Sequence, residues 1–242
     1  MENHRNGSEN SINAARLALA IDTNIDRRRP SAVNYKQQIL LMGGWQGSTY
    51  YNSVEMLDLN DENPKWDSNL PSMGEKRGLF VSALLDGLVY CAGGENDTGY
   101  LSSCESYNPE ERKWSSIRNM SKIRSLHALV SARGLLYALG GYDGYNKTNT
   151  AEFYDPRNGK WEYIPPMKTC RGDLTAVVLN NEIYAIGGYG LSSVEKYNLD
   201  TKTWIDVPSM NGTRYGGSAC VVDGLIWVFG GNCQPGVHEP QD

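Results

Sequence analysis

Histidines and cysteines are the residues of this sequence most able to do chemistry, and neither set forms a recognisable centre. The three histidines, His4, His127 and His238, are far apart in the sequence, so a copper centre built on several imidazoles is hard to assemble. The five cysteines contain no C-x-x-C pair, which argues against a zinc site and a disulfide framework. H-E-x-x-H, P-loop and G-x-S-x-G motifs are also missing. We therefore expect no catalytic residues, no metal and no other cofactor.

Charged residues recur at regular places instead. Glutamates follow the second glycine of a pair by 11 residues at Glu55, Glu105 and Glu152, and by 7 residues at Glu195. Arginines stand four residues after a methionine and 16 residues before the next glycine pair, at Arg77, Arg124, Arg171 and Arg214. Charges repeated in every unit are expected to brace strands and turns. The Arg-Gly-Asp sequence at 171–173 is therefore interpreted as part of the repeat and not as an integrin ligand.

The glycine pairs themselves end short apolar runs and set the period of the chain. The runs QILLMGG, LVYCAGG, LLYALGG, EIYAIGG and LIWVFGG place the second glycines 50, 47, 47 and 43 residues apart. A period of this length indicates a repeat architecture. We expect structural roles for the paired glycines and for one tryptophan in each unit, namely Gly43, Gly44, Gly93, Gly94, Gly140, Gly141, Gly187, Gly188, Trp66, Trp114, Trp161 and Trp204.

Each unit reads as four β-strands. In the third repeat GDLTAVVL reaches the turn residues NN, and EIYAIGG, SSVEKYN and TWIDV follow, separated by further turn residues. A twisted sheet that is apolar on both faces cannot bury itself, and copies stacked around an axis bury one another. The sequence therefore predicts an all-β propeller of four-stranded antiparallel blades.

The glycine pair, the tyrosine seven residues before each later tryptophan, and M-x-x-x-R together resemble kelch repeats over about residues 38 to 231. The first unit departs from the pattern, with Leu57 in the place of the tyrosine. The upstream segment RRRPSAVNYKQQILLMGG is similar to the one that joins the BACK domain to the propeller in BTB-BACK-kelch proteins. That resemblance implies the target-recognition part of a cullin-RING ubiquitin ligase adaptor, here without its BTB and BACK domains.

The strand count predicts a partial propeller of about four to five blades. Three strands are expected in the first blade, four in each of the next three, and only the first two in the last. A surplus apolar strand would leave an exposed edge, which favours a truncated product. The expected organisation is a lead-in at 1–37, partly disordered or a short helix, then kelch repeats over 38–232 and a tail at 233–242. The repeats are expected at 38–86, 87–133, 134–180, 181–224 and, in part, 225–232.

Loops that differ between repeats are where a binding site is expected, because loops on a rigid scaffold carry function. The resemblance implies a pocket lined by residues after each glycine pair and after each repeat arginine, Gly78 and Gly172 included. Longer loops rich in tyrosine add further candidates. The expected protein-binding residues are Trp45, Tyr50, Glu95, Tyr100, Ser125, Tyr142, Lys147, Tyr189 and Tyr215. Each could instead be a solvated turn residue, and His127 could line the channel or pack in the core.

Composition limits the partners. A net charge of -5 supplies no basic surface for nucleic acid, and no apolar run is long enough to span a bilayer. We expect a cytoplasmic protein that binds a peptide segment of a target protein and contacts cullin only indirectly or in a longer form. Two alternatives stay open: a kelch protein that binds actin, and a kelch-propeller enzyme.

Overall fold

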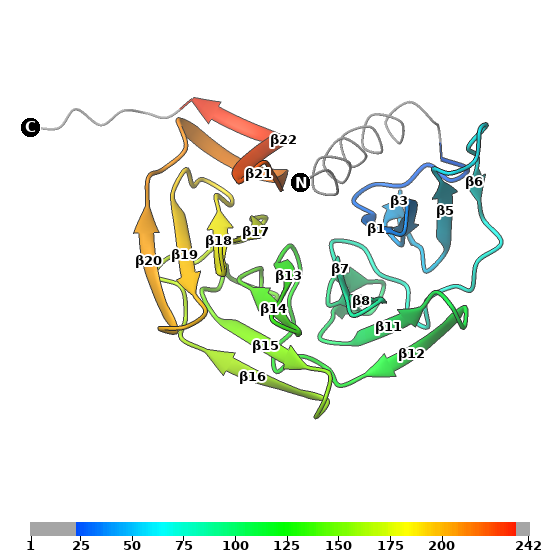
Figure 1. Cartoon of the computed structure of the whole chain (residues 1–242), viewed down its shortest axis with the longest axis horizontal. Helices are drawn as coiled ribbons and strands as arrows, with labels where there is room; N and C mark the ends of the chain where they lie inside the picture. Colours follow the sequence, from blue (N-terminus) through cyan, green and yellow to red (C-terminus); the bar gives the residue numbers. More distant parts are fainter. Residues whose placement is uncertain (1–22, 236–242) are drawn as a thin grey trace, which may run out of the picture. The chain divides into compact units, whose positions relative to one another are not determined.

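The computed structural model describes residues 23–235, with side chains described up to residue 232. Within these residues the regular structure consists of strands (Figure 1). The chain divides into two compact units, Met1–Asn119 and Met120–Asp242. The helix or disorder expected at the start of the chain, His4, His238 and residues 236–242 of the tail lie outside the described residues.

The first unit contains two four-stranded antiparallel sheets and two short hairpins. The first sheet has the order β1 (Ser31–Tyr35), β2 (Gln38–Met42), β5 (Val54–Asp58) and β6 (Trp66–Asp67). The second sheet has the order β7 (Val81–Leu85), β8 (Leu88–Ala92), β11 (Cys104–Asn108) and β12 (Lys113–Ile117). The hairpins follow the glycine pairs and consist of β3 (Trp45–Gln46) with β4 (Thr49–Tyr50), and β9 (Glu95–Asn96) with β10 (Gly99–Tyr100).

The second unit repeats the same plan and ends in a long hairpin. Its first sheet consists of β13 (Ala128–Ala132), β14 (Leu135–Leu139), β15 (Ala151–Asp155) and β16 (Lys160–Ile164). Its second sheet consists of β17 (Thr175–Leu179), β18 (Glu182–Ile186), β19 (Val194–Asn198) and β20 (Thr203–Val207). The final two-stranded sheet pairs β21 (Gly212–Val222) with β22 (Leu225–Pro235).

The four-stranded antiparallel sheets confirm the expected blades, with one difference. The first sheet has four strands and not three, because Ser31–Tyr35 pairs with Gln38–Met42 as its first strand. The polar residues around Asn34 concealed this strand from a search for apolar runs. The first sheet therefore begins upstream of residue 38, within the expected lead-in. The boundaries between repeats stay predictions.

The glycine pairs lie where the backbone needs them. Gly93 and Gly94 have φ angles of 60° and 95°, which favour glycine. A Cβ atom on Gly94 would lie 2.7 Å from the Cβ of Phe80. Any side chain at this position would therefore push apart the start of β7 and the end of β8.

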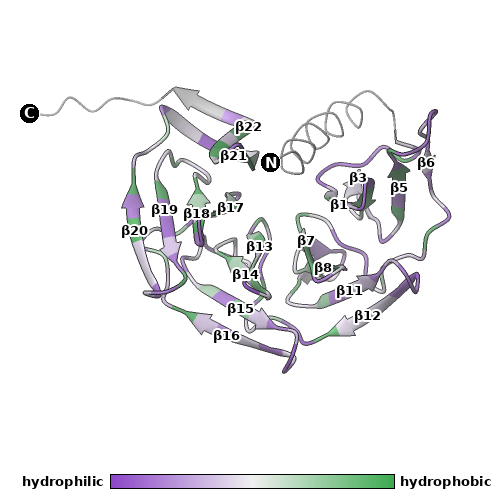
Figure 2. Cartoon of the chain, viewed as in Figure 1, coloured by the Kyte–Doolittle hydropathy of each residue, from purple (hydrophilic) through white to green (hydrophobic). Residues whose placement is uncertain are grey.

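Tyrosine–tryptophan pairs join the third and fourth strands of three sheets. The ring centroids of Tyr197 and Trp204 lie 5.1 Å apart, and the Trp204 indole N–H donates to the Pro165 carbonyl. Trp204 is buried in a core that also contains Met167 and Ile183. The second strand of this sheet, β18, is largely hydrophobic, whereas β20 also carries hydrophilic segments (Figure 2). The tryptophans therefore contribute packing area and not a binding platform.

Candidate functional site

The repeat arginines and glutamates form buried braces in each sheet. Arg171 donates to the carbonyls of Gly187 and Ser193 at 2.8 and 2.7 Å. Its guanidinium also pairs with Glu195 at 2.9 Å, and both side chains are fully buried. The Glu195 carboxylate accepts the backbone N–H groups of Lys168 and Thr169 as well. One brace thus ties the loop before the first strand to the second and third strands.

The same brace occurs in the preceding sheets. Arg124 pairs with Glu152 and Arg77 pairs with Glu105, at 3.0 and 2.8 Å. These side chains are buried, which excludes them from direct contact with a partner. The structure supports the expected bracing role of these charges.

A further brace, missed in the sequence, involves Arg27. Its guanidinium pairs with Glu55 at 2.8 Å and donates to the carbonyls of Gly43 and Ser53. No methionine precedes this arginine by four residues, so the M-x-x-x-R pattern did not find it. The spacing of 16 residues to Gly43 was the available signal.

The first loop cluster, as we call Trp45, Tyr50, Glu95 and Tyr100, lies on the two short hairpins of the first unit. Trp45 pairs with Tyr50 across β3 and β4, and Glu95 pairs with Tyr100 across β9 and β10. The Tyr50 hydroxyl donates to Glu95 Oε1 at 2.8 Å, which joins the hairpins. Four of the expected binding residues therefore come together.

Burial and charge shape this cluster. Desolvation, followed by the hydrogen bond to Glu95, raises the pKa of Tyr50 to about 12, so its hydroxyl stays protonated and a donor. Gly78 makes room for the aromatic rings, since a Cβ there would lie 3.0 Å from Trp45 Cε3 and 3.1 Å from Tyr50 Cε1. Tyr100 is 44% exposed and offers its ring to solvent.

The second loop cluster, as we call Tyr142, Lys147, Tyr189 and Tyr215, lies within the second unit. The Lys147 ammonium donates to the Tyr189 carbonyl at 3.2 Å and lies 5.7 Å from the centre of the Tyr189 ring. The rings of Tyr189 and Tyr215 are 4.9 Å apart. Backbone bridges connect Tyr142 to Lys147 and to Ser125. The side chains of Lys147, Tyr189 and Tyr215 therefore lie together, and backbone pairing places Tyr142 beside Lys147.

Gly172 and Ser125 lie beside Tyr142 of the second loop cluster. Gly172 leaves the space that the Tyr142 ring fills, because a Cβ there would collide with the ring. Desolvation is the main cause that raises the pKa of Tyr142, which keeps its hydroxyl protonated. Ser125 is only 1% exposed, so the structure places it beneath the surface, unlike the other candidates.

His127 packs in the interior. It is buried, and neither ring nitrogen has a hydrogen-bond partner among the described residues. Desolvation, with a smaller contribution from Arg124, lowers the pKa of His127 to about 3, so the ring is neutral at physiological pH. Between the two sequence interpretations, the structure favours the core position.

A family model described as "Kelch motif" matches residues 26–67, 76–121, 123–168 and 170–211, which together cover more than half of the chain. The chain belongs to the kelch-repeat family. The first matched repeat begins beside Arg27, in agreement with the brace found there. In this chain the loops that carry the aromatic clusters differ in sequence between repeats.

Relatives and a solved structure are similar to parts of the kelch chain. An F-box/kelch-repeat protein of Arabidopsis thaliana is 36% identical over 87 residues, covering 35% of this chain and 21% of the relative. Kelch-like protein 26 of Danio rerio is 38% identical over 50 residues, covering 21% of this chain and 8% of the relative. The matched segments thus span only a small part of each relative.

The solved structure of YjhT matches 87% of this chain and 74% of its own, with a TM-score of 0.76 and 18% sequence identity. At this identity the match shows the kelch propeller fold and nothing about activity. Within residues 23–235 no group of three histidine, cysteine or acidic side chains could hold a metal ion. In the same residues, no helix has the length and apolar character needed to cross a membrane.

Proposed function

We propose that this kelch chain is a protein-interaction module that recognises a peptide segment of a target protein through its loop clusters, without catalysing a reaction. The observation that carries the proposal is the second loop cluster, where Tyr189 packs against both the Lys147 cation and the Tyr215 ring, and backbone bridges hold Tyr142 beside Lys147. Rigid aromatic side chains supply contact area at low entropic cost. Tyr189 is 53% exposed and therefore available to a partner.

The two clusters differ in charge, which suggests what they recognise. The first loop cluster contains the carboxylate of Glu95, and the second contains the ammonium of Lys147. Each cluster therefore favours a peptide group of opposite charge, in addition to apolar side chains packed on the aromatic rings. Selectivity would come from this difference, since the buried braces are the same in each repeat.

We further propose that the target is presented for ubiquitin transfer by an associated ligase in the cytoplasm. Curated relatives that carry an F-box beside their kelch repeats, and a kelch-like protein, are compatible with this role. Membership of the BTB-BACK-kelch family belongs to the same proposal. In this chain cullin would be contacted indirectly or in a longer form.

The test is partner recovery from cells with the proteasome inhibited. Replacing Tyr142 and Tyr189 by alanine is expected to reduce recovered target at least about tenfold, because hot-spot aromatics dominate binding energy. Tyr163→Ala is the matched control, since Tyr163 is 52% exposed and lies on β16 outside both clusters. Equal recovery with the double variant and the wild type would remove this surface as the site.

The identity of the recovered proteins separates the functional alternatives. Enrichment of ligase subunits together with the target supports the adaptor role. Enrichment of actin filament components without ligase subunits would replace it by a cytoskeletal role. Cell fractionation with the same tagged chain tests the cytoplasmic location.

A further inference from the structure

Glu95 places a carboxylate where the other matched repeats have an aromatic ring. The residue directly after the glycine pair is Trp45 in the first repeat, Glu95 in the second, and Tyr142 and Tyr189 in the next two. Glu95 is also only partly buried, in contrast to the buried glutamates of the braces. Its charge is therefore a feature of one loop and not of the repeat.

The Glu95 carboxylate can accept further hydrogen bonds. The Tyr50 hydroxyl donates to Oε1 of Glu95 at 2.8 Å. Among the residues that the structure describes, no arginine, lysine or histidine pairs with Glu95, although the backbone of Arg28 pairs with that of Trp45 in the same cluster. An ionised carboxylate has about four lone-pair sites, so one phenol leaves room for two more donors.

Aromatic rings flank this carboxylate. The ring centroids of Trp45 and Tyr50 lie 6.4 Å apart with the planes tilted by 36°, and both rings pack on the backbone of Gly78. Tyr100 pairs with Glu95 across β9 and β10 and is 44% exposed. Residues directly opposite each other in a hairpin have their side chains on one face, so the Tyr100 ring lies beside the carboxylate.

The charge around this cluster is negative. Asp97 lies in the turn between β9 and β10 and is exposed. Desolvation is the main cause that raises the pKa of Tyr50, and the charges of Glu95 and Asp97 raise it further. Both carboxylates therefore act on the same phenol, and a cation beside that phenol would be attracted by both.

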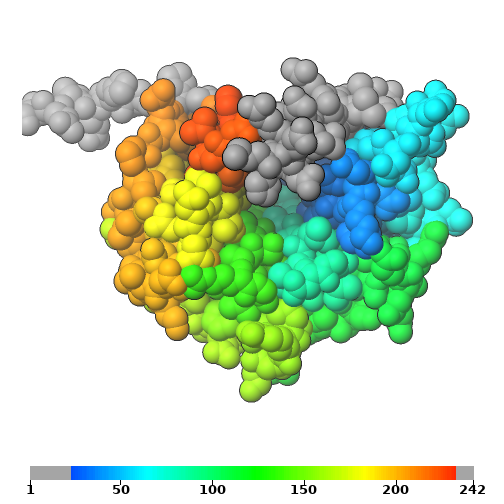
Figure 3. Space-filling model, viewed as in Figure 1, coloured from blue at the N-terminus to red at the C-terminus, as the bar shows by residue number. Residues whose placement is uncertain are grey.

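Neighbouring sheets hold the two hairpins of the first unit. Strands β1 and β7 are in contact, and the two sheets reach the surface side by side in the space-filling view, in blue and blue-green (Figure 3). The two hairpins are joined directly by the bond between Tyr50 and Glu95. The first loop cluster is therefore held by two sheets and not by one flexible loop.

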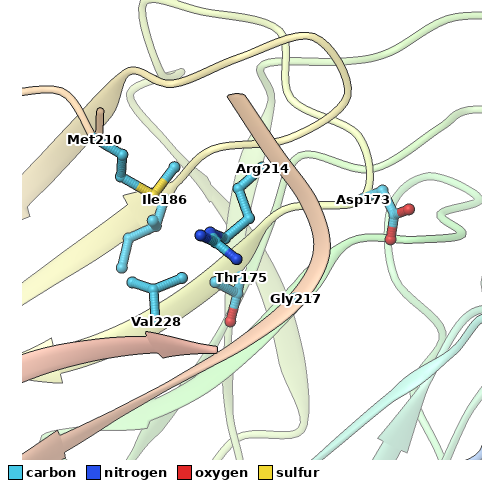
Figure 4. Close-up of a pocket in the computed structure, with 7 residues that line it drawn as sticks. All are labelled: Asp173, Thr175, Ile186, Met210, Arg214, Gly217 and Val228. Atoms are coloured by element: carbon cyan, nitrogen blue, oxygen red, sulfur yellow. The ribbon is translucent and has the colours of Figure 1, made fainter. Parts of the chain in front are cut away.

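A pocket in the second unit shows the opposite charge. Met210, Ile186 and Val228 line it together with the Arg214 guanidinium (Figure 4). Asp173 also lines this pocket, but in Figure 4 its carboxylate points away from the guanidinium. A cation would be repelled there, so the first loop cluster is the better place for one.

We propose that the first loop cluster binds an arginine side chain of the target peptide, with the guanidinium hydrogen-bonded to Glu95 and packed on the flanking aromatic rings. A guanidinium is planar, is more weakly hydrated than an ammonium, and donates two parallel N–H groups to one carboxylate. It also stacks on the faces of tryptophan and tyrosine. The inference rests on the proposed function, because it names the peptide group that this cluster recognises.

The probe is N-acetyl-arginine amide, added to the whole chain labelled with ¹⁵N. Its binding is followed through the indole N–H signal of Trp45, which the spectrum of the Trp45→Phe variant identifies. We expect a saturable shift of this signal. N-acetyl-citrulline amide, which has the same shape without the charge, should bind at least about fivefold more weakly, and N-acetyl-lysine amide should also bind more weakly. Affinity for either of these equal to that for arginine would overturn the proposal.

A pair of matched variants assigns the preference to Glu95. Glu95→Gln keeps an oxygen that accepts the Tyr50 hydroxyl but has no charge, so it should bind the arginine and citrulline probes equally. The control is Glu62→Gln, at an exposed glutamate in a loop of the same unit, and it should retain the preference for arginine. A preference retained in Glu95→Gln, or lost in the control, would overturn the proposal.

Two further comparisons separate this inference from its alternatives. Failure of the wild type to bind the probe would overturn it, and binding restored by Arg5→Gln with Arg16→Gln would assign the site to this chain's own arginines. If the probe fails to bind while target recovery still depends on Tyr142 and Tyr189, the inference falls and the proposed function stands. If the probe binds while recovery is independent of these tyrosines, the second loop cluster is removed as a target site and the arginine site stands.

Discussion

At the scale of single residues, the buried charge pairs are the feature most sensitive to substitution, because each charge needs its partner. Arg171 and Glu195 are fully buried, and together they satisfy backbone groups from three segments. A buried pair of this kind adds little over an apolar pair of equal shape, but removing one partner leaves an uncompensated charge. Replacing one residue of the pair should therefore lower the free energy of unfolding by more than the intact pair contributes to it.

Glu195→Gln tests this expectation. The variant keeps the shape of the side chain but leaves the Arg171 guanidinium without a carboxylate, so we expect the free energy of unfolding to fall by about 3 kcal/mol. The control is Asp206→Asn, which removes the exposed partner of Lys168 and should cost less than about 1 kcal/mol. Urea unfolding measures both. Similar losses in the two variants would show that the braces are not the buried units described here.

His127 gives the chain a specific dependence on pH. Because burial lowers the pKa of His127 in the folded state to about 3, below the 6.5 of the unfolded chain, folding favours the neutral ring. Its contribution is fully present above pH 6.5 and is lost progressively as the pH falls towards 3. Between pH 7 and pH 5 this one group should cost about 2 kcal/mol of stability.

His127→Phe isolates the effect of that histidine. Phe80 occupies the corresponding place in the preceding repeat, three residues after its arginine, so the replacement suits the packing. We expect the urea midpoint of the variant to change less than that of the wild type between pH 7 and pH 5. Identical pH profiles would show that folding does not lower the pKa of His127.

At the scale of elements, the two-residue turns between first and second strands are built to one geometry with different residues. Asn180 and Asn181 both have positive φ angles, of 49° and 64°, and so do Lys36 and Gln37, at 46° and 63°. Glycine and asparagine tolerate these angles, whereas glutamine is strained in them. The turn between β1 and β2 is therefore the least well matched of the set.

Gln37→Gly is expected to stabilise the chain by up to about 1 kcal/mol, because relief of strain exceeds the added entropy of the unfolded glycine. The reverse change in the next repeat, Gly87→Gln at a φ of 80°, should destabilise by a similar amount. Urea midpoints of the two variants provide the comparison. A loss of stability with Gln37→Gly would mean that the glutamine side chain supports the turn through contacts that outweigh the strain.

At the scale of the whole molecule, the braces, tyrosine–tryptophan pairs and turns recur within each repeat. In repeat proteins stability is approximately a sum of the stability of each repeat and of its contacts with its neighbours. A substitution in a brace should therefore lower the local stability most in the repeat that contains the brace. Local opening of this kind is visible in hydrogen exchange.

Glu195→Gln gives the test at this scale too. We expect amide exchange to increase most over residues 170–211, the matched repeat that contains the brace, and least over residues 26–67. Hydrogen exchange with mass spectrometry resolves these segments in one experiment. A uniform increase along the chain would show that the repeats unfold as one cooperative unit.

The sequence by itself determined the repeat, the four-stranded sheets and the positions of most brace residues, because these depend on local pattern and fixed spacing. Tertiary structure decided which groups meet. The Tyr50–Glu95 hydrogen bond and the buried place of Ser125 depend on loops folding back across strands. So does the left-handed backbone two residues after the repeat arginines, as at Leu79 and Leu126, with φ angles of 53° and 51°. Such contacts join residues distant in the chain, and no spacing within one sequence specifies them; they arise when the packed sheets hold otherwise unfavourable local conformations in place.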